Sequence, residues 1–268
     1  MPMLHLAVLA IVQGITEFLP VSSSGHLVLV PVFAGWDDQG LLLDVAVHVG
    51  TLGAVMLYLW RDLFVMAGGI GRFLRGRRDA GARLFLYVVL ATLPVIGAGL
   101  LLNMHFPNGI RSIEVIGWTT LGFGVFLGFS DWMGMTVRRI EHVRFLDALI
   151  IGVFQMLALI PGTSRSGITM SAARLMGFER PDAARFSMLL SIPAILGAGV
   201  LKGLELYEGG DAELTHEALL AAGMAFGAAL ISIVVMMAWL RRASFAPFVF
   251  YRVALGCVLL AIAYGYIG

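Results

Sequence analysis

Residues 3–33 read MLHLAVLAIVQGITEFLPVSSSGHLVLVPVF, an apolar stretch that polar residues interrupt in its middle. Residues 146–177 read LDALIIGVFQMLALIPGTSRSGITMSAARLMG and are interrupted in the same way. Each stretch predicts a short helix, a polar non-helical loop and another short helix. Such backbone at membrane depth is tolerated only where protein buries it or where it lines a wet cavity. We therefore expect two re-entrant hairpins.

The composition places these hairpins in a membrane protein. Of the 268 residues, 59% are hydrophobic and 13% are charged, whereas a soluble domain carries about 25% charged residues. A transmembrane helix needs about 20 mostly apolar residues. Six stretches qualify: roughly 41–60, 84–102, 112–130, 183–202, 217–240 and 247–267. We expect an all-α polytopic membrane protein, with six transmembrane helices plus the two hairpins in a single domain, 1–268.

Several protein classes are disfavoured. The net charge of +1 gives no sign of nucleic acid binding. The one cysteine, Cys257, excludes a disulfide framework and is interpreted as a small buried hydrophobe. Without a P-loop, nucleotide hydrolysis lacks support. The N-terminal sequence lacks a basic n-region and a small-residue cleavage site, so no cleaved signal peptide is expected.

Basic residues predict the orientation. They fall into four groups, which the positive-inside rule places in the cytoplasm, while the remaining loops are acidic or nearly neutral. We therefore expect both termini on the outer (periplasmic) side. The groups are the loop from Arg61 to Arg83 with Arg72, Arg75, Arg77 and Arg78, then Arg138, Arg139 and Arg144, then Arg180 and Arg185, and finally Arg241 and Arg242.

The two hairpins also align with each other at an offset of 142 residues. Gln13 falls on Gln155, and 22–25 falls on 164–167. The identity is weak, and chance is an alternative explanation. The charge rule independently makes the first hairpin enter from outside and the second from inside. This predicts an inverted-topology repeat, about 1–130 and about 145–268, whose hairpins meet near the midplane at the functional site.

The first hairpin carries an acid beside hydroxyl groups. Gln13 and Glu17 share one helix face. A carboxylate inside a membrane is a functional hypothesis by default, and Glu17 suits a metal ligand or a base. The alternative is a structural partner for a hydroxyl or a buried arginine. Ser22–Gly25 can cradle phosphate oxygens with hydroxyl and N–H groups, or can simply cap the next helix. These residues are Ser22, Ser23, Ser24 and Gly25.

Two further side chains complete the predicted site. His26 is the residue most able to move protons near neutral pH. Arg165, in the second hairpin, needs an anion at membrane depth, and its guanidinium fork matches phosphate. A salt bridge from Arg165 to Glu17 across the repeat interface is an alternative, and both can hold. Further donors come from Thr163, Ser164, Ser166 and the loop that ends at Gly167.

No metal site is evident from spacing, although a hard cation could be held by Glu17 and substrate phosphates. Asp44 and His48, four apart on one helix face, could line the cavity, but a polar pair at a helix end is the favoured interpretation.

Three motifs combine in this order: Gln13-x-x-x-Glu17, Pro20-Val-Ser-Ser-Ser-Gly-His26 and Pro161-Gly-Thr-Ser-Arg-Ser-Gly167. They resemble the signature regions of bacterial undecaprenyl-diphosphate phosphatase of the bacitracin-resistance type. The resemblance spans the chain. It implies a phosphatase of the bacterial plasma (inner) membrane that hydrolyses undecaprenyl diphosphate and so recycles the carrier lipid for peptidoglycan synthesis. The family pattern begins with Glu or Gln and has Glu four residues later. Because this sequence has Gln13 at the first position, Glu17 is the main acidic candidate for holding a metal. A divalent cation, Mg²⁺ or Ca²⁺, is also implied.

A mechanism consistent with these residues has Ser23 attack the terminal phosphorus while His26 or Glu17 takes its proton. Arg165, backbone N–H groups and a cation would stabilise the developing charge. Ser22 or His26 as the nucleophile is an alternative. We expect the lipid tail between helices that face the bilayer and the site opening outward.

The rival function is a transporter or flippase of a polyprenyl (di)phosphate or another anionic substrate, because inverted repeats with broken helices are a transporter pattern. The expected partners are the bilayer and a polyprenyl diphosphate, with no nucleic acid. A homodimer is left open.

Overall fold

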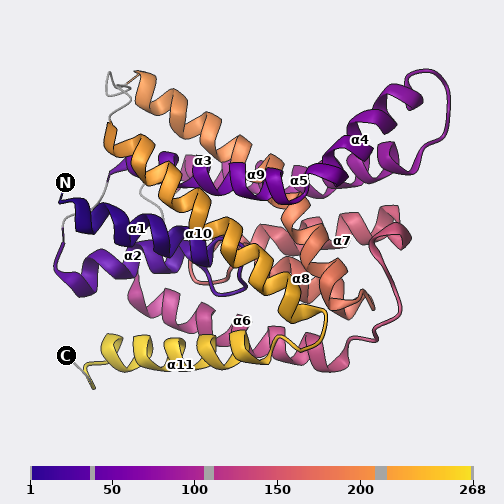
Figure 1. The fold of residues 1–268 in the computed structure, drawn as a ribbon. Coiled ribbons are helices and arrows are strands. Elements are labelled where there is room, and N and C mark those ends of the chain that lie inside the picture. The colour runs from indigo at the N-terminus through magenta and orange to yellow at the C-terminus, as the bar shows by residue number, and fades with distance from the viewer. Residues whose placement is uncertain (1, 37–39, 106–111, 209–215, 267–268) are drawn as a thin grey trace.

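The computed structural model describes residues 2–36, 40–105, 112–208 and 216–266, and within them it is all-helical (Figure 1). This confirms the predicted fold class. The helices are α1 (Met3–Thr16), α2 (Ser23–Ala34), α3 (Leu41–Tyr58), α4 (Trp60–Phe73), α5 (Ala80–His105), α6 (Ile113–Met133), α7 (Phe145–Met156), α8 (Arg165–Leu175), α9 (Arg180–Glu208), α10 (His216–Leu240) and α11 (Ala246–Ala263), with short 3₁₀ turns at Ile140–His142 and Leu157–Leu159.

The helices include the predicted membrane spans. Among the described residues, five helices are long and apolar enough to cross a bilayer, namely α5, α6, α9, α10 and α11. The sixth predicted span is α3, which turns by 76° at Leu59 into α4. The chain is therefore a multi-pass membrane protein, and its spans lie close to the stretches that hydropathy predicts.

One expectation about the arginine-rich segment was wrong. The arginine-rich segment from Arg61 was expected to be a loop, but its first part is the helix α4. Gly69 of α4 approaches α5 so closely that a Cβ there would meet the backbone nitrogen of Ala82. Asp62, at the start of α4, forms an ion pair with Arg185 of α9. These contacts anchor α4 against two spans.

Both predicted hairpins are present as pairs of short helices. α1 and α2 have 14 and 12 residues, and α7 and α8 have 12 and 11. Each is too short to cross a bilayer alone, since about 20 residues are needed. Figure 1 shows α1 and α2 near the end that carries the N-terminus and α7 and α8 near the other end, with their turns between. The hairpins thus approach the interior from opposite ends.

The two turns share an unusual backbone conformation. Among the described residues, Ser22 and Ser164 are the non-glycine residues with positive φ, at 75° and 71°. This left-handed conformation costs about 1–2 kcal/mol for an L-residue, so the surroundings must hold it. At Ser164 the side chain caps α8, because its Oγ accepts a hydrogen bond from Gly167 N at 3.1 Å.

Small residues bring the hairpins against the spans. α1 packs on α10, and a Cβ at Gly14 would lie 2.6 Å from Ala228 Cβ. α7 packs on α5, and a Cβ at Gly152 would lie 2.6 Å from the Ala91 carbonyl oxygen. Such close backbone approach is typical of helix packing in membranes.

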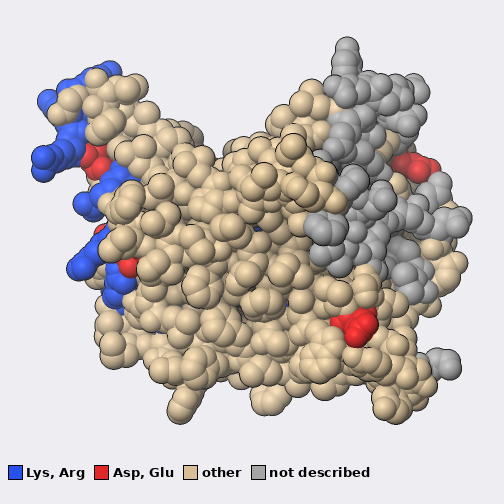
Figure 2. Space-filling model, turned by 180° about the vertical axis from the view of Figure 1, so that it is seen from behind, with Lys and Arg blue, Asp and Glu red and all other residues tan. Residues whose placement is uncertain are grey.

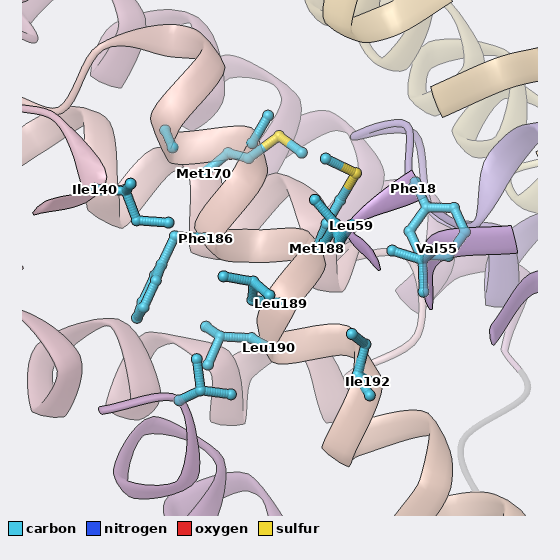
Figure 3. Packing of buried hydrophobic residues seen from close by; sticks show 14 of the residues in the cluster. Phe18, Val55, Leu59, Ile140, Met170, Phe186, Met188, Leu189, Leu190 and Ile192 are labelled. Atoms are coloured by element: carbon cyan, nitrogen blue, oxygen red, sulfur yellow. The ribbon is translucent and has the colours of Figure 1, made fainter. Parts of the chain in front are cut away.

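The buried core reaches the first turn. Phe18, directly after Glu17, belongs to one buried cluster with Val55 of α3, with Leu59 directly after α3, and with four residues of α9, namely Met188, Leu189, Leu190 and Ile192 (Figure 3). By contrast, Cys257 is exposed on α11, so its interpretation as a buried residue was wrong. It lies on a helix whose outer face would contact lipid, where a small apolar thiol is also tolerated.

Charge is distributed between the two ends. On the face seen in Figure 2, Lys and Arg side chains gather at one edge, which is the end of α4 and α7 in Figure 1. Both chain ends lie at the opposite end in Figure 1. The basic groups that are far apart in the sequence are therefore brought to one side.

Candidate active site

Glu17 is the centre of the polar cluster. It ends α1, where its N–H bonds to the Gln13 carbonyl, and it is 7% exposed. Its Oε2 accepts hydrogen bonds from Gln13 Nε2 at 2.8 Å and from Ser23 Oγ at 2.7 Å. Its Oε1 accepts from Arg165 Nη2 at 2.9 Å. One carboxylate therefore contacts predicted site residues from both hairpins.

Arg165 begins α8, and its side chain is 17% exposed. Besides the bond to Glu17, Nη1 donates to the Ser187 carbonyl at 3.4 Å. The salt bridge that was considered as an alternative is thus present. A guanidinium has five N–H donors, and the contacts within the described residues use two of them. Arg165 can therefore keep Glu17 and still bind phosphate oxygens.

A chain of hydrogen bonds joins the second turn to the first. Gly167 N donates to Ser164 Oγ, which lies 3.1 Å from Ser166 Oγ, and Ser166 Oγ donates to the Leu19 carbonyl at 2.8 Å. Because the one proton of Ser166 goes to that carbonyl, the Ser164 hydroxyl is the donor between the two serines. The turns are therefore held in register by hydroxyl groups as well as by the ion pair.

Two hydroxyl groups at the turns are left without partners. Ser22 Oγ and Thr163 Oγ1 are buried and make no hydrogen bond within the part of the chain that the structure describes. A buried unsatisfied hydroxyl is unfavourable, which points to a ligand or water that completes it. A Cβ at Gly25 would lie 3.3 Å from Ser22 Oγ, so glycine keeps this space open. The side chain of Ser24 lies outside the described residues.

The ring nitrogens of His26 contact groups other than the Ser23 hydroxyl. Its Nδ1 lies 2.7 Å from the Ser22 carbonyl, which can only accept, so Nδ1 carries the proton. Its Nε2 then accepts from Tyr251 Oη at 2.6 Å, with the two rings stacked. Both ring nitrogens are thus engaged in this conformation. The group hydrogen-bonded to Ser23 is Glu17, which is therefore the base in place for its proton.

His48 contributes more than a helix-end pair. Its Nδ1 bonds to the Asp44 carbonyl at 2.6 Å, while its Nε2 lies 4.0 Å from Glu17 Oε2. The interpretation of His48 as one of two polar residues at a helix end was incomplete, because the imidazole faces the site. The available signal was an imidazole within a predicted membrane span, one turn after Asp44.

Sequence reasoning also missed two residues of α11. Tyr251 bonds to His26, and Arg252 is fully buried between the turns. The signal for Arg252 was a lone charge within the apolar stretch 247–267, which is a functional hypothesis in a membrane segment.

The polar cluster around Glu17 also contains oxygen atoms that are suitable ligands for a divalent cation. Within the described residues, no group of three or more His, Cys, Asp or Glu side chains converges. However, Gln13 Oε1 is buried without a hydrogen-bond partner in the same ranges, next to the Glu17 carboxylate. A hard cation prefers such oxygen ligands and often takes few of them from protein when phosphates supply the rest. Gln13 and Glu17 therefore fit a cation shared with a phosphate ligand.

Comparisons with known proteins point in the same direction. The family model described as "Bacitracin resistance protein BacA" matches residues 6–258. "Undecaprenyl-diphosphatase 1" of Rhodospirillum rubrum is 56% identical over 272 residues, covering 98% of this chain and 96% of that protein. The "Undecaprenyl-diphosphatase" proteins of Ruegeria pomeroyi and Dinoroseobacter shibae are each 52% identical, covering 98% of this chain and all of theirs.

Proposed function

Because the chain belongs to the bacitracin resistance protein BacA family, we propose that it is an integral membrane phosphatase acting on undecaprenyl diphosphate. It releases inorganic phosphate and undecaprenyl phosphate, the carrier lipid for peptidoglycan synthesis. The observation that carries this proposal is the contact of Glu17 with both Ser23 and Arg165. A nucleophile (Ser23), a base (Glu17) and a guanidinium that can bind phosphate (Arg165) are thereby joined within a membrane domain.

The first step transfers the terminal phosphoryl group to the protein. Ser23 Oγ attacks the terminal phosphorus, and its proton passes to Glu17 along the 2.7 Å hydrogen bond. The bond from phosphorus to the bridging oxygen breaks, and undecaprenyl phosphate leaves with that electron pair. Phosphoryl transfer depends mainly on positioning and on stabilising charge, which the free N–H groups of Arg165 and the start of α2 supply.

The second step releases phosphate. A water attacks the phosphoserine at Ser23, the Ser23 oxygen leaves, and Glu17 returns the proton to it. His26, fixed by Tyr251 and by the Ser22 carbonyl, holds the turn that carries Ser23. Ser22 Oγ and Thr163 Oγ1, which have no partner among the described residues, would donate to phosphate oxygens.

A divalent cation, Mg²⁺ or Ca²⁺, is part of the proposal. Gln13 and Glu17 would hold it. When bound, it would neutralise negative charge on the diphosphate.

The fold is proposed to be an inverted repeat. Three observations support it: α1 packs on α10 as α7 packs on α5, α3 packs on α10 as α9 packs on α5, and α6 packs on α11. When the first half is mapped onto the second, α1, α3, α5 and α6 correspond to α7, α9, α10 and α11. The contact of α1 with α10 then corresponds to that of α7 with α5, the contact of α3 with α10 corresponds to that of α9 with α5, and the contact of α6 with α11 corresponds to itself. The positive φ angles at Ser22 and Ser164 are also 142 residues apart, as the alignment of the halves predicts.

The orientation is proposed from charge. The end where basic side chains gather (Figure 2) would face the cytoplasm under the positive-inside rule. Both termini would then face the outer side, together with the entry of the hairpin that carries Glu17. We propose that the site opens to this side.

The polyprenyl chain is proposed to occupy an apolar groove of about 740 Å³ between α1, α10 and α11. The one polar residue of its lining, Ser232, has its hydroxyl engaged by the Ile15 carbonyl at 2.9 Å. The groove reaches Leu19, two residues after Glu17, so a chain lying there would end beside the first turn. The other lining residues include Ile11, Ile15, Met224, Ile231, Val235, Trp239 and Phe248.

Phosphate release tests the function. Purified protein in detergent, given undecaprenyl diphosphate and Mg²⁺, should release phosphate with Michaelis–Menten kinetics. Folded protein that releases none would contradict the proposal. The paired short hairpins favour a transporter or flippase as the second candidate. Transfer of intact diphosphate lipid between vesicle leaflets, without hydrolysis, would support that candidate instead.

A further inference from the structure

Arg252 lies between the two turns and has no carboxylate partner among the described residues. It is on α11, and its side chain is fully buried. A buried charge is strongly unfavourable unless it is paired or fully hydrogen-bonded. The contacts of its guanidinium within the described residues are all with backbone carbonyl oxygens. Such a costly residue calls for a role that an apolar side chain could not fill.

The four hydrogen bonds of Arg252 join three separate segments. Nη1 donates to Pro20 O at 3.3 Å, in the first turn, and Nη2 donates to Gly162 O at 2.9 Å, in the second. Nε and Nη2 also donate to α6, at Thr120 O (3.2 Å) and Thr119 O (3.4 Å). The planar fork spreads its five donors over a wide angle, so one side chain reaches both turns at once.

These carbonyls lie close in sequence to the reacting groups. Pro20 is three residues from Ser23 and from Glu17, and Gly162 is three residues from Arg165. The space next to the guanidinium is also restricted, since a Cβ at Gly167 would lie 2.9 Å from Arg252 Nη1. A movement of this side chain would therefore shift one turn relative to the other.

We propose that Arg252 is a positioning residue that sets the distance between the Ser23–Glu17 turn and the Arg165 turn. This inference rests on the proposed phosphatase function. Arg252 acts through the two turns and does not touch the reacting phosphate. Lysine keeps the charge but presents a single ammonium, which cannot span both carbonyls in the same geometry.

Arg174 provides a matched control. It is also fully buried and donates to three carbonyls, those of Asp131, Gly134 and Phe178, as well as to the Asp131 carboxylate. It lies in the last turn of α8, away from both turns of the site. Replacing arginine by lysine therefore removes hydrogen bonds to buried carbonyl oxygens at both positions, while only Arg252 holds the turns.

The experiment compares Arg252→Lys, Arg252→Met and Arg174→Lys in detergent. Phosphate release from undecaprenyl diphosphate gives kcat and KM, and size-exclusion chromatography gives the folded fraction. A 1 Å misplacement of reacting groups can lower a rate by about 10²-fold. We expect kcat of Arg252→Lys to fall by about this factor per folded protein, with a further fall in Arg252→Met. KM should stay within about threefold of the wild-type value, and Arg174→Lys should keep its kcat.

Three results would overturn the proposal. The first is a folded Arg252→Lys protein with kcat within twofold of wild type. The second is an equal loss of kcat in Arg174→Lys. The third is an Arg252→Lys protein that does not fold although Arg174→Lys does, because the residue would then serve the fold alone. A wild-type protein that releases no phosphate would instead contradict the proposed function.

Discussion

Replacing Glu17 by Gln removes one charge and the base while keeping the shape of the side chain. Glu17 accepts from Ser23 at 2.7 Å and from Arg165 at 2.9 Å, so both contacts change together. Loss of a positioned base lowers a rate by about 10²–10⁴-fold. We therefore predict that kcat falls by about 10³-fold, which is about 4 kcal/mol of transition-state stabilisation.

At a Mg²⁺ concentration high enough to saturate the proposed cation site of Gln13 and Glu17, the same substitution should not raise KM. Without the carboxylate, the Arg165 guanidinium is free to bind the diphosphate with more of its N–H groups, so substrate binding is kept or improved. Removing one partner of a buried ion pair costs about 3–5 kcal/mol of stability. The loss here should be at the lower end, because Arg165 is 17% exposed and also bonds to Ser187 O.

Asp62→Asn is the matched control for this prediction. Asp62 is 9% exposed and pairs with Arg185 at the end of the fold where the basic side chains gather, away from the two turns. Both variants should lower the thermal midpoint, but only Glu17→Gln should lower kcat. The assay is phosphate release per folded protein, with the folded fraction from size-exclusion chromatography. A Glu17→Gln enzyme with kcat within threefold of wild type would refute the reasoning, as would an equal loss in Asp62→Asn.

The remaining predictions concern the nucleophile, the cation and the lipid chain. Ser23→Ala should abolish an acid-stable phosphoprotein trapped with labelled substrate, whereas Ser22→Ala should retain it; an acid-labile phosphohistidine in the wild type would refute Ser23 as nucleophile. Chelation of divalent cations should abolish phosphate release, and added Mg²⁺ or Ca²⁺ should restore it; full activity after exhaustive chelation would remove the cation from the proposal. Ile231→Trp, which narrows the groove, should raise KM for undecaprenyl diphosphate by about tenfold, equivalent to about 1.4 kcal/mol, and raise it less for farnesyl diphosphate. Val234→Trp, at an exposed position of the same helix that does not line the groove, should change neither value, and equal effects of both tryptophans would contradict the groove assignment.

Much of the fold follows from hydropathy, because each span satisfies its backbone internally and must be apolar along its length. The hairpins were predictable for the opposite reason: polar residues at Glu17 and at 163–167 interrupt stretches that would otherwise be spans. α4 was missed because its glycines and arginines are also typical of a loop. Its helix depends on packing between Gly69 and α5, which no local pattern reveals.

The site was predictable only where its residues are clustered in sequence. Glu17, Ser23 and Arg165 lie in the two interrupted stretches, and the structure brings them together. His48 and Arg252 come from other helices: His48 was interpreted as part of a helix-end pair with Asp44, and Arg252 is the one charged residue of the apolar stretch 247–267. Their contacts join residues that are far apart in the chain, so periodicity and spacing do not reveal them.

The central claim is that the two hairpins form one phosphate site between Ser23 and Arg165. The most direct test is an experimental structure with a non-hydrolysable methylene diphosphonate analogue of the substrate. Our account predicts the terminal phosphorus in line with Ser23 Oγ at about 3–3.5 Å, the separation of a near-attack geometry, with Arg165 donating to its oxygens. An analogue whose phosphonates bind away from both turns, or contact Arg165 but not Ser23, would contradict the account.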